Sequence, residues 1–514
     1  MSKTPSDKLH RLIRSLSAPE KRYFRIFIRG KTERDSKYLQ LFEVLASMEE
    51  FNEEEIKKQV YKNQPLPEPT VYPKLKAYLY NLVIKCLQNF DEQHSTEHRL
   101  NQMLQGVAVL FKRGHYDDCH DLLHKAARLA RQYEAFAHQL DIIRWQKQLA
   151  YTRMDADYLH KNLDQLLFDE QRALEQLRNA AEYRKAFFQV YATTLQRASQ
   201  HRGEGHARHL QSIVSQEVFS SPDLATSHKA RVMYYRTLNI YHYGAMQFEA
   251  FYDTGKTLIA LLESQPHFLR ESLSDYIAAL SNLILSCGLL RKYDEVRECL
   301  QKLRSLKPIT EDDRRKIHRQ YFNNLFVLCI YTGEFAEAHE EMERCQREAA
   351  LFDPHAYETA SFYYQYALIC FGNDDFNGAL QHLNHWLGQP RSVEREDLQS
   401  LARILLLIVH YEMGNTVLLE SLLRSAMRFL QKKNRFFQLE KRFMHLVVDL
   451  MRATTTRERD AAFQKMQEDL EKEGKLPGVR TLLQTFDLGA WLESKLKHQT
   501  FAAAVREKFV RSEG

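Results

Sequence analysis

The sequence predicts an all-α protein built around a helical repeat array, and three observations support this fold class. Six stretches share one pattern: a turn residue, in most copies an aromatic residue two positions later, and a small or apolar residue three positions further. The last five recur in chain order at a spacing of roughly 40–45 residues, and a near-fixed period of this size is typical of helical repeats. The chain holds only 17 Gly and 12 Pro, which suits helices, and no alternating apolar stretch supports a sheet. The six stretches are Gly114–Cys119, Met246–Phe251, Arg291–Val296, Gly333–Ala338, Asp374–Ala379 and Gly414–Leu419.

The composition places the chain among globular proteins. Hydrophobic residues make up 44% of the 514 residues and charged residues 27%, which is unlike a disordered chain. The seven cysteines form no CxxC pair, so we expect them to be small buried hydrophobes in a reducing compartment. The first residues lack the apolar core of a signal peptide, and the longest apolar stretch, 401–409, is far shorter than a membrane span. We therefore predict a cytoplasmic protein without a membrane segment.

Residues 1–92 form a predicted N-terminal unit that is helical and basic. Residues 1–37 hold eleven Lys/Arg and four Asp/Glu, a net charge of +7, whereas the whole chain carries +6. A capping box at Ser17–Glu20 predicts one helix start, and Asn52 predicts another. A short helix, a break and a long helix from Thr70 also suggest a helix-turn-helix. In that alternative, Lys74, Lys76 and Tyr80 would face DNA. We favour a helical cap of the array, because the break of about eight residues exceeds the three to four of a helix-turn-helix.

Residues 100–445 form the predicted array. Gly333-Glu334-Phe335-Ala336-Glu337-Ala338 resembles in full the turn of the tetratricopeptide family, Gly-x-Tyr/Phe-x-x-Ala, and Pro308 falls where that family closes a repeat. These features resemble the tetratricopeptide repeat, which implies a right-handed α-solenoid, here of about eight helical hairpins. The period is longer than the one typical of that family, and residues 127–230 lack clear turns. Even spacing predicts turns there near 155–158 and 202–205. Ala338 should be buried in its hairpin.

Residues 446–514 are predicted to be a helical C-terminal cap, with a break at Pro477-Gly478. Such a cap would cover the last apolar face of the array.

The sequence offers little catalytic or ligand chemistry. His120 and His124 share a helix face at the spacing of zinc ligands, but Asp121 replaces the glutamate that a metalloprotease needs. Gly255-Lys256-Thr257 ends like a phosphate loop without the preceding strand. The histidines at 201, 206 and 209 have no cysteine or paired carboxylates beside them. We therefore predict no enzyme, no cofactor and no metal site.

In proteins that resemble tetratricopeptide repeats, the first helix of each hairpin lines the inner curve where partners bind. By register with the turns, aromatic, amide and arginine side chains on these helices suit a peptide or a helix. The predicted function is a protein- or peptide-binding scaffold. The alternative is a regulator whose residues 1–92 bind nucleic acid while the array senses a protein. The partner-binding candidates are Arg236, Tyr243, Asn323, Tyr364, Phe371 and Tyr411.

Overall fold

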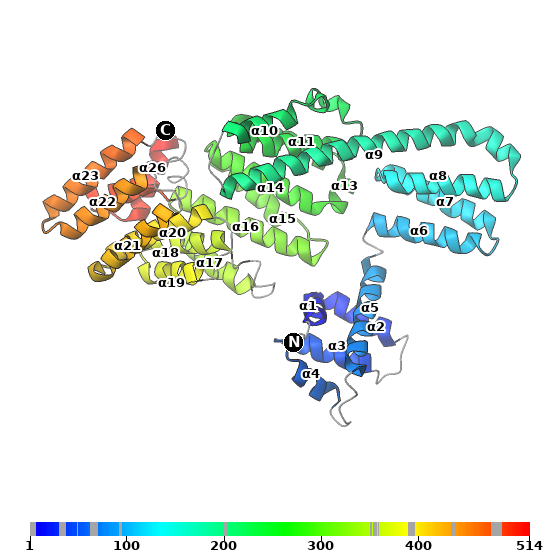
Figure 1. The fold of residues 1–514 in the computed structure, drawn as a ribbon, viewed down its shortest axis with the longest axis horizontal. Coiled ribbons are helices and arrows are strands. Elements are labelled where there is room, and N and C mark those ends of the chain that lie inside the picture. Colours follow the sequence, from blue (N-terminus) through cyan, green and yellow to red (C-terminus); the bar gives the residue numbers. More distant parts are fainter. Residues whose placement is uncertain are drawn as a thin grey trace. The chain divides into compact units, whose positions relative to one another are not determined.

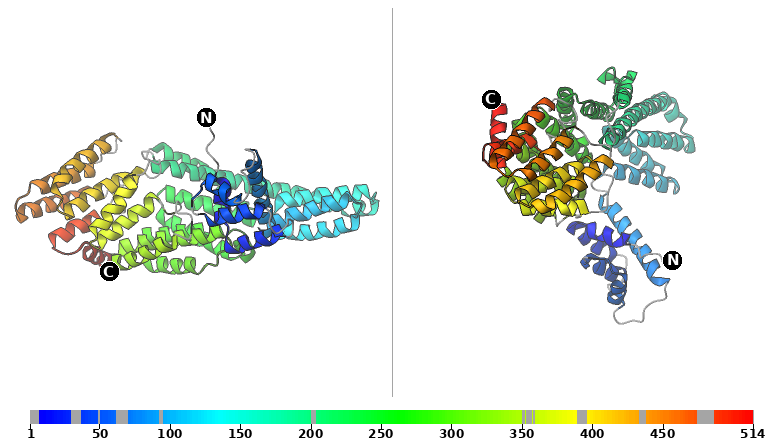
Figure 2. Two further views of the ribbon diagram at one scale, coloured as in Figure 1. Left: turned by 90° about the horizontal axis from the view of Figure 1, so that it is seen from below. Right: turned by 60° about the vertical axis from the view of Figure 1, so that its left-hand side comes forward.

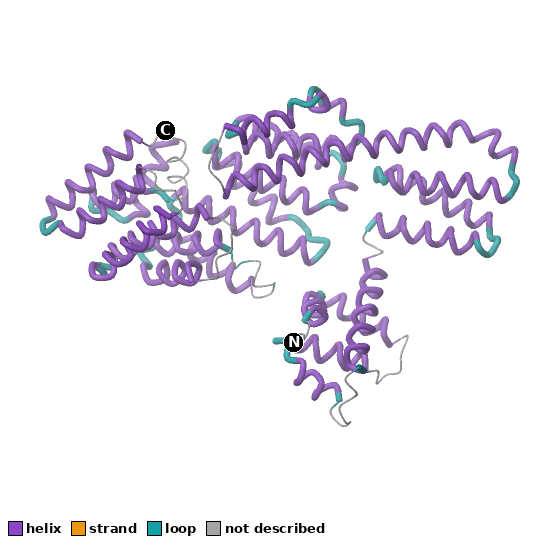
Figure 3. Tube along the Cα trace, viewed as in Figure 1, coloured by secondary structure: helices purple, strands orange, loops and turns teal. Residues whose placement is uncertain are grey.

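The protein is helical throughout the residues that the computed structural model describes. These residues are 7–29, 37–48, 50–61, 70–91, 95–199, 204–349, 352, 357, 359–388, 396–432, 438–473 and 486–513. Helix accounts for 86% of them, in 25 α-helices, and no strand occurs among them (Figure 3). The predicted all-α class is therefore confirmed. Within the same ranges, no helix has the length and apolar character needed to cross a bilayer.

The chain divides into two compact units, which are described separately (Figure 1). The first comprises residues 1–182, 225–231 and 265–271, and the second comprises 183–224, 232–264 and 272–514. The long helix α9 (Ala156–Ser199) begins in the first unit and ends in the second, and α11 (His228–Gly244) does likewise. The other helices of the first unit are α1 (Lys8–Ser15), α2 (Ala18–Arg29), α3 (Lys37–Ser47), α4 (Glu53–Val60), α5 (Val71–Asp91), α6 (Thr96–Phe111), α7 (Tyr116–Gln132), α8 (Phe136–Thr152) and α13 (Pro266–Glu271).

Helices α1 to α5 share one core, formed by their apolar faces. Phe24 of α2 stacks on Phe42 of α3, with ring centroids 4.3 Å apart, and both rings are buried. The predicted helix starts are also confirmed. Ser17 and Glu20 form reciprocal hydrogen bonds, and the Asn52 side chain accepts from two N–H groups of the first turn of α4. These caps satisfy donors that the helices leave unpaired.

Two carboxylates connect α6 and the α7–α8 turn with parts of the first unit that come much later in the chain. The Glu271 carboxylate accepts the N–H and the hydroxyl of Thr96, the latter at 2.6 Å. The Glu134 carboxylate accepts the N–H groups of His228 and Lys229, each at 2.8 Å, at the start of α11. A negative charge at a helix N-terminus is favourable, because unpaired N–H groups and the positive end of the helix dipole lie there.

In the second unit, helices alternate between a first and a second helix of each pair. The first helices are α11, α14 (Leu273–Leu289), α16 (Glu311–Thr332), α18 (Ala360–Gly372) and α20 (Glu396–Glu412). The second helices are α12 (Phe248–Glu263), α15 (Tyr293–Ser305), α17 (Phe335–Ala349), α19 (Phe376–Gly388) and α21 (Thr416–Lys432). From α14 on, each first helix packs against the next first helix as well as its own second helix. The remaining elements are α10 (Glu204–Val214), the 3-10 helices η1 (Glu217–Phe219) and η2 (Pro222–Leu224), α22 (Gln438–Arg452), α23 (Thr456–Glu473), α25 (Leu488–Leu496) and α26 (Phe501–Glu513).

One turn geometry recurs between consecutive helices. Every residue of the described chain with a left-handed backbone sits in such a turn, namely Gly114, Glu134, Met154, Met246, Arg291, Gly333, Asp374, Gly414 and His498. In each, the next N–H donates to a carbonyl five residues earlier, as Glu334 does to Cys329 at 2.9 Å. This bond satisfies a carbonyl at the helix end, and the left-handed residue makes it possible. All six turns predicted from the sequence are confirmed.

Residues 127–230 differ from the prediction. A turn does follow Met154, close to the expected 155–158, but an unexpected turn at Glu134 separates α7 from α8. Beyond it, α9 continues for 44 residues without interruption. No Gly or Pro occurs between 156 and 199 to end it, and helix interiors exclude mainly these two residues. The evenly spaced hairpins expected here are therefore wrong. Of the other expected turn, at 202–205, residues 202 and 203 lie outside the described residues, and residues 204 and 205 begin α10 (Glu204–Val214).

The turn at Gly333 shows why small and aromatic residues recur at these places. Ala338 is fully buried in α17, as predicted, and Phe335 is buried beside it. An ideal Cβ on Gly372 would stand 2.2 Å from the Phe335 ring. The aromatic residue of one turn therefore packs directly on the first helix of the next pair.

The end of the second unit returns over helices that come much earlier in the chain. Helices α22 and α23 pack side by side and are drawn in orange in Figures 1 and 2. Helix α25 packs on α23, and α26 packs on both α25 and α16. The predicted break at Pro477-Gly478 lies outside the described residues. All seven cysteines are buried and unpaired with one another.

Candidate functional site on the first helices and their turns

The six residues predicted to contact a partner all lie on first helices. They are Arg236 and Tyr243 in α11, Asn323 in α16, Tyr364 and Phe371 in α18, and Tyr411 in α20. Their burial differs along the series, from 42% exposed at Tyr243 to 1% exposed at Phe371. Their contact with a partner stays a prediction, and their surroundings decide which of them a partner could reach.

Arg236 is held by its neighbours in the second unit. Its guanidinium donates to Asp275 of α14 at 2.8 Å and lies 4.7 Å from the centre of the Phe187 ring. Only 18% of the side chain is exposed. A charge-assisted hydrogen bond and a cation–π contact together fix its position. Arg236 therefore links α11 to α14, and only a small part of its side chain is exposed for contact with a partner.

Asn323 also serves as a connection between first helices. Its side-chain and backbone oxygens accept from the Gln365 amide of α18, at 3.3 and 3.1 Å. Similar polar links join α11 to α14 through Asn239 and Asn282, at 3.2 Å, and α14 to α16 through Ser274 and Lys316, at 2.9 Å. Hydrogen bonds between buried or half-buried polar groups fix the register of neighbouring helices. These polar links were not predicted, although the partners in each link are separated by one repeat of the sequence.

Tyr364 and Phe371 lie in the interior of the second unit. Both are almost fully buried, and the Tyr364 hydroxyl has no hydrogen-bond partner, an uncommon state for a buried group. Burial raises the pKa of Tyr364 far above the usual value of a tyrosine. Tyr243, by contrast, is 42% exposed. Of the six candidates, Tyr243 is the one most open to solvent.

The turns of these helices are contacted by residues 486–513, the segment that holds α25 and α26. The Phe486 and Phe501 rings lie 5.8 and 5.2 Å from Phe371, and Phe501 also lies 5.5 Å from Phe335. Phe509 lies 5.0 Å from Tyr293 in the turn between α14 and α15. The segment therefore covers the turns of three successive helix pairs.

Trp491 fixes the same segment to α20. Its indole is 1% exposed and lies among the rings of Tyr411, Phe443 and Phe463. The indole N–H donates to the Glu412 carboxylate at 2.7 Å, and Lys495 donates to the same carboxylate at 2.6 Å. Tyr411 is thus engaged by the chain itself.

A backbone contact completes this docking. The Arg506 guanidinium donates to the Gly333 carbonyl at 3.0 Å. A Cβ on Gly333 would come within 2.8 Å of the Arg506 side chain and 3.0 Å of its backbone nitrogen. Glycine at this turn therefore serves both the left-handed backbone and the close approach of α26. The sequence predicted a C-terminal cap within residues 446–514, but not that its end docks on turns much earlier in the chain.

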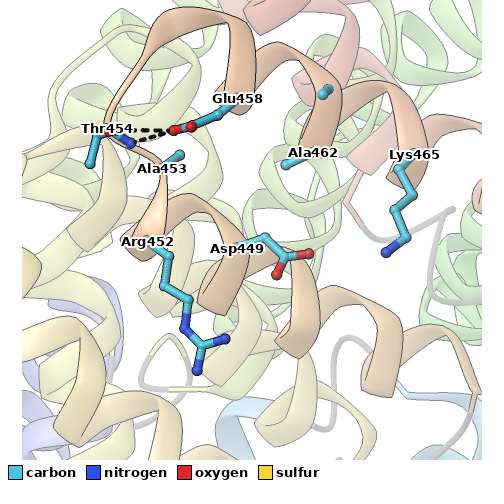
Figure 4. Close-up of a pocket in the computed structure, with 8 residues that line it drawn as sticks. Asp449, Arg452, Ala453, Thr454, Glu458, Ala462 and Lys465 are labelled. Atoms are coloured by element: carbon cyan, nitrogen blue, oxygen red, sulfur yellow. Dashed lines mark hydrogen bonds between the residues drawn. The ribbon is translucent and has the colours of Figure 1, made fainter.

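A shallow hollow lies between the end of α22 and the start of α23 (Figure 4). Its charged side chains are Asp449, Arg452, Glu458 and Lys465. Glu458 accepts the N–H groups of Thr454 and Thr455, and these bonds hold the pKa of its carboxyl below the usual range. Glu458 is thus a helix cap, and the Thr454 hydroxyl also donates to its carboxylate at 3.2 Å.

Two motifs considered in the sequence for phosphate or zinc binding lie within helices of the described chain. Gly255, Lys256 and Thr257 lie inside α12, so their backbone cannot wrap a phosphate. His120 and His124 are both exposed on α7.

The proposed DNA-facing residues of α5 do not share one surface. Lys76 is 19% exposed, pairs with Glu53 at 3.4 Å and lies over the rings of Phe51 and Tyr72. Lys74 and Tyr80 are exposed. Lys76 is therefore turned into its own bundle, which the helix-turn-helix hypothesis did not anticipate.

Two groups of side chains could each hold a metal ion among the described residues. One consists of His339, Cys370 and Asp375, and the other of Cys329, Glu334 and Glu337. Burial and the nearby Asp375 carboxylate raise the pKa of the Cys370 thiol to about 12.

Comparison with known proteins adds no identification. No protein-family model matches the chain, and a search of curated proteins finds no match.

Proposed function

We propose that the chain is a protein-binding scaffold whose helix pairs form an α-solenoid of the tetratricopeptide-like kind. The observation that supports this function is the docking of residues 486–513 on the turns of successive helix pairs. Two helices lie along the turns of successive pairs and are held by buried aromatic residues and a carboxylate. Because the same turn recurs, an edge of this kind offers repeated contacts to a helical partner.

The side chains that hold residues 486–513 in place indicate which residues a partner helix would need. Trp491 fills an aromatic pocket and donates to Glu412, a combination typical of the residues that dominate binding energy. The Arg506 guanidinium donates a hydrogen bond to the backbone carbonyl of Gly333, which lies in a left-handed turn. A partner helix with a tryptophan and basic residues would satisfy both. In the full chain the tethered segment competes at an effective concentration on the order of millimolar.

A peptide supplied separately tests this function. A fluorescent peptide of residues 486–513 should bind the full-length Trp491→Ala variant, whose own segment is loosened, and should not bind the wild type. Fluorescence anisotropy measures the binding, and circular dichroism checks that the variant stays helical. A peptide carrying the same Trp491→Ala change is the control and should bind weakly. A Trp491→Ala protein that stays helical but does not bind the unaltered peptide would contradict the proposal.

A second function rests on the charges of α1 and α2. Burial lowers the pKa of Lys21, and the nearby positive charges of Arg14 and Arg25 lower it further. Arg25 is itself paired with Glu43 through two hydrogen bonds, at 2.7 and 2.8 Å. Crowded cations favour a polyanion, so nucleic acid would bind at α1 and α2 rather than at α5.

Salt dependence tests this second function. If the full-length protein binds random duplex DNA, its affinity should fall steeply with salt, because phosphate contacts release counterions. The triple change Arg14→Gln, Lys21→Gln and Arg22→Gln should then lower the slope of log K against log salt by about 2–3. The exposed Lys472→Gln, from the second unit, is the control. Binding that survives the triple change with an unaltered slope rules out α1 and α2 as the site.

A further inference from the structure

Three side chains with different ligand chemistries meet where α17, α18 and α19 come together. They are His339 on α17, Cys370 near the end of α18, and Asp375 in the turn before α19. One ligand atom from each lies within 4.8 Å of the others. An imidazole, a thiol and a carboxylate from three elements thus converge on one point.

A glycine makes room for this arrangement. A Cβ on Gly378, in the first turn of α19, would stand 2.1 Å from Oδ2 of Asp375 and 3.1 Å from Sγ of Cys370. Oδ1 of the same carboxylate accepts the Gly378 N–H at 2.9 Å and caps the helix. Glycine weakens a helix at such a position. Its presence keeps one carboxylate oxygen beside the thiol.

We propose that His339, Cys370 and Asp375 bind one Zn²⁺ ion, a function separate from the binding of a protein partner. Zinc prefers nitrogen, sulfur and oxygen ligands in a tetrahedron, with bonds of roughly 2.0–2.3 Å, so neighbouring donors stand roughly 3.4–3.6 Å apart. Because the donors here lie within 4.8 Å of one another, they need to close by no more than about 1.4 Å to reach that spacing. The ion replaces the thiol proton, which passes to the solvent, and a water molecule takes the fourth position. The half-buried His339 leaves the site open on one side.

The preceding turn provides a natural comparison. Cys329 and Glu334 occupy the positions of Cys370 and Asp375, one repeat earlier in the sequence. There, however, Glu334 pairs with Arg297 at 3.1 Å and accepts from the Thr332 hydroxyl at 2.8 Å. The group contains no imidazole. A guanidinium already neutralises this carboxylate, so we expect zinc at the later turn.

Cobalt reports sulfur ligation directly. Full-length protein stripped of metal by a chelator should bind one Co²⁺ with a thiolate-to-cobalt charge-transfer band in the near ultraviolet, and Zn²⁺ should displace it. Cys370→Ser should abolish the band. His339→Ala should weaken Zn²⁺ binding by roughly tenfold or more, since even changes outside the ligand shell cost that much. His339 is half-buried, so this variant tests the site without disturbing the core.

Cys329→Ser is the matched control, because this thiol is as buried as Cys370 and holds the same place in its turn. It should keep the cobalt band and the zinc affinity. Gly378→Ala should lose zinc binding by displacing the Asp375 carboxylate. The proposal is overturned if the wild type shows no charge-transfer band, or if the band is lost in Cys329→Ser and kept in Cys370→Ser. In the first case, the three side chains are neighbours through helix packing alone.

Discussion

Replacement of Trp491 by alanine is expected to lower the free energy of unfolding by about 3–5 kcal/mol, the cost of removing a large buried aromatic side chain. The indole is 1% exposed and fills the space between three aromatic rings, so its loss leaves a cavity. The change also removes a hydrogen bond to Glu412, whose side chain is only 10% exposed. Chemical denaturation followed by circular dichroism measures the effect.

Trp491→Phe is the control for this prediction. It keeps an aromatic ring in the pocket and loses mainly the N–H donor, so its effect should be clearly smaller than that of alanine. A loss below about 1 kcal/mol for Trp491→Ala, the size typical of ordinary substitutions, would show that residues 486–513 contribute little to the stability of the second unit.

Gly372→Ala should also be strongly destabilising although it adds one methyl group. The new Cβ would stand 2.2–2.4 Å from three atoms of the Phe335 ring. That ring is buried and touches Phe501, so it cannot move aside freely. Overpacking of this kind costs about 1–3 kcal/mol and occasionally more. We expect the upper end of that range, measured by the shift of the denaturation midpoint.

Gly288→Ala is the matched control, because Gly288 also lies in a first helix and its Cβ would meet no atom within 4 Å. Alanine at a compatible position stabilises by about 0.4–1 kcal/mol. The double variant Gly372→Ala with Phe335→Leu should recover part of the stability lost in the single variant. Equal effects of alanine at 288 and 372 would contradict the packing of Phe335 on α18.

The turns could be predicted from the sequence because their causes are local. Left-handed residues, small residues and aromatic residues occur at fixed distances around Gly333, and the hydrogen bonds close within five residues. Six of the nine turns use a residue other than glycine at the left-handed position. Three of these, at Met246, Arg291 and Asp374, were still predicted from the residues that follow them. Glu134 was missed because Gln139 stands where the other copies have a small or apolar residue, although the aromatic Phe136 is in place.

The contacts between distant segments could not be predicted in the same way. The bond from Arg506 to Gly333 spans 173 residues, and no spacing rule identifies such pairs. The register of the turns did place Arg236 and Asn323 on first helices. It could not show that their polar groups are occupied by Asp275 and Gln365. Similarly, the thiol of Cys370 and the imidazole of His339 lie on different helices and become neighbours only through packing.

The docking of residues 486–513 over earlier helices has a consequence for synthesis of the protein. A chain made from its N-terminus releases the helices that carry Phe335, Phe371 and Tyr411 before it releases the segment that covers them. Until residue 486 and its successors leave the ribosome, these aromatic side chains lack that cover, and exposed apolar surface of this kind promotes aggregation. A ribosome that stalls after α23 would therefore hold a product that chaperones and proteases can distinguish from the finished chain.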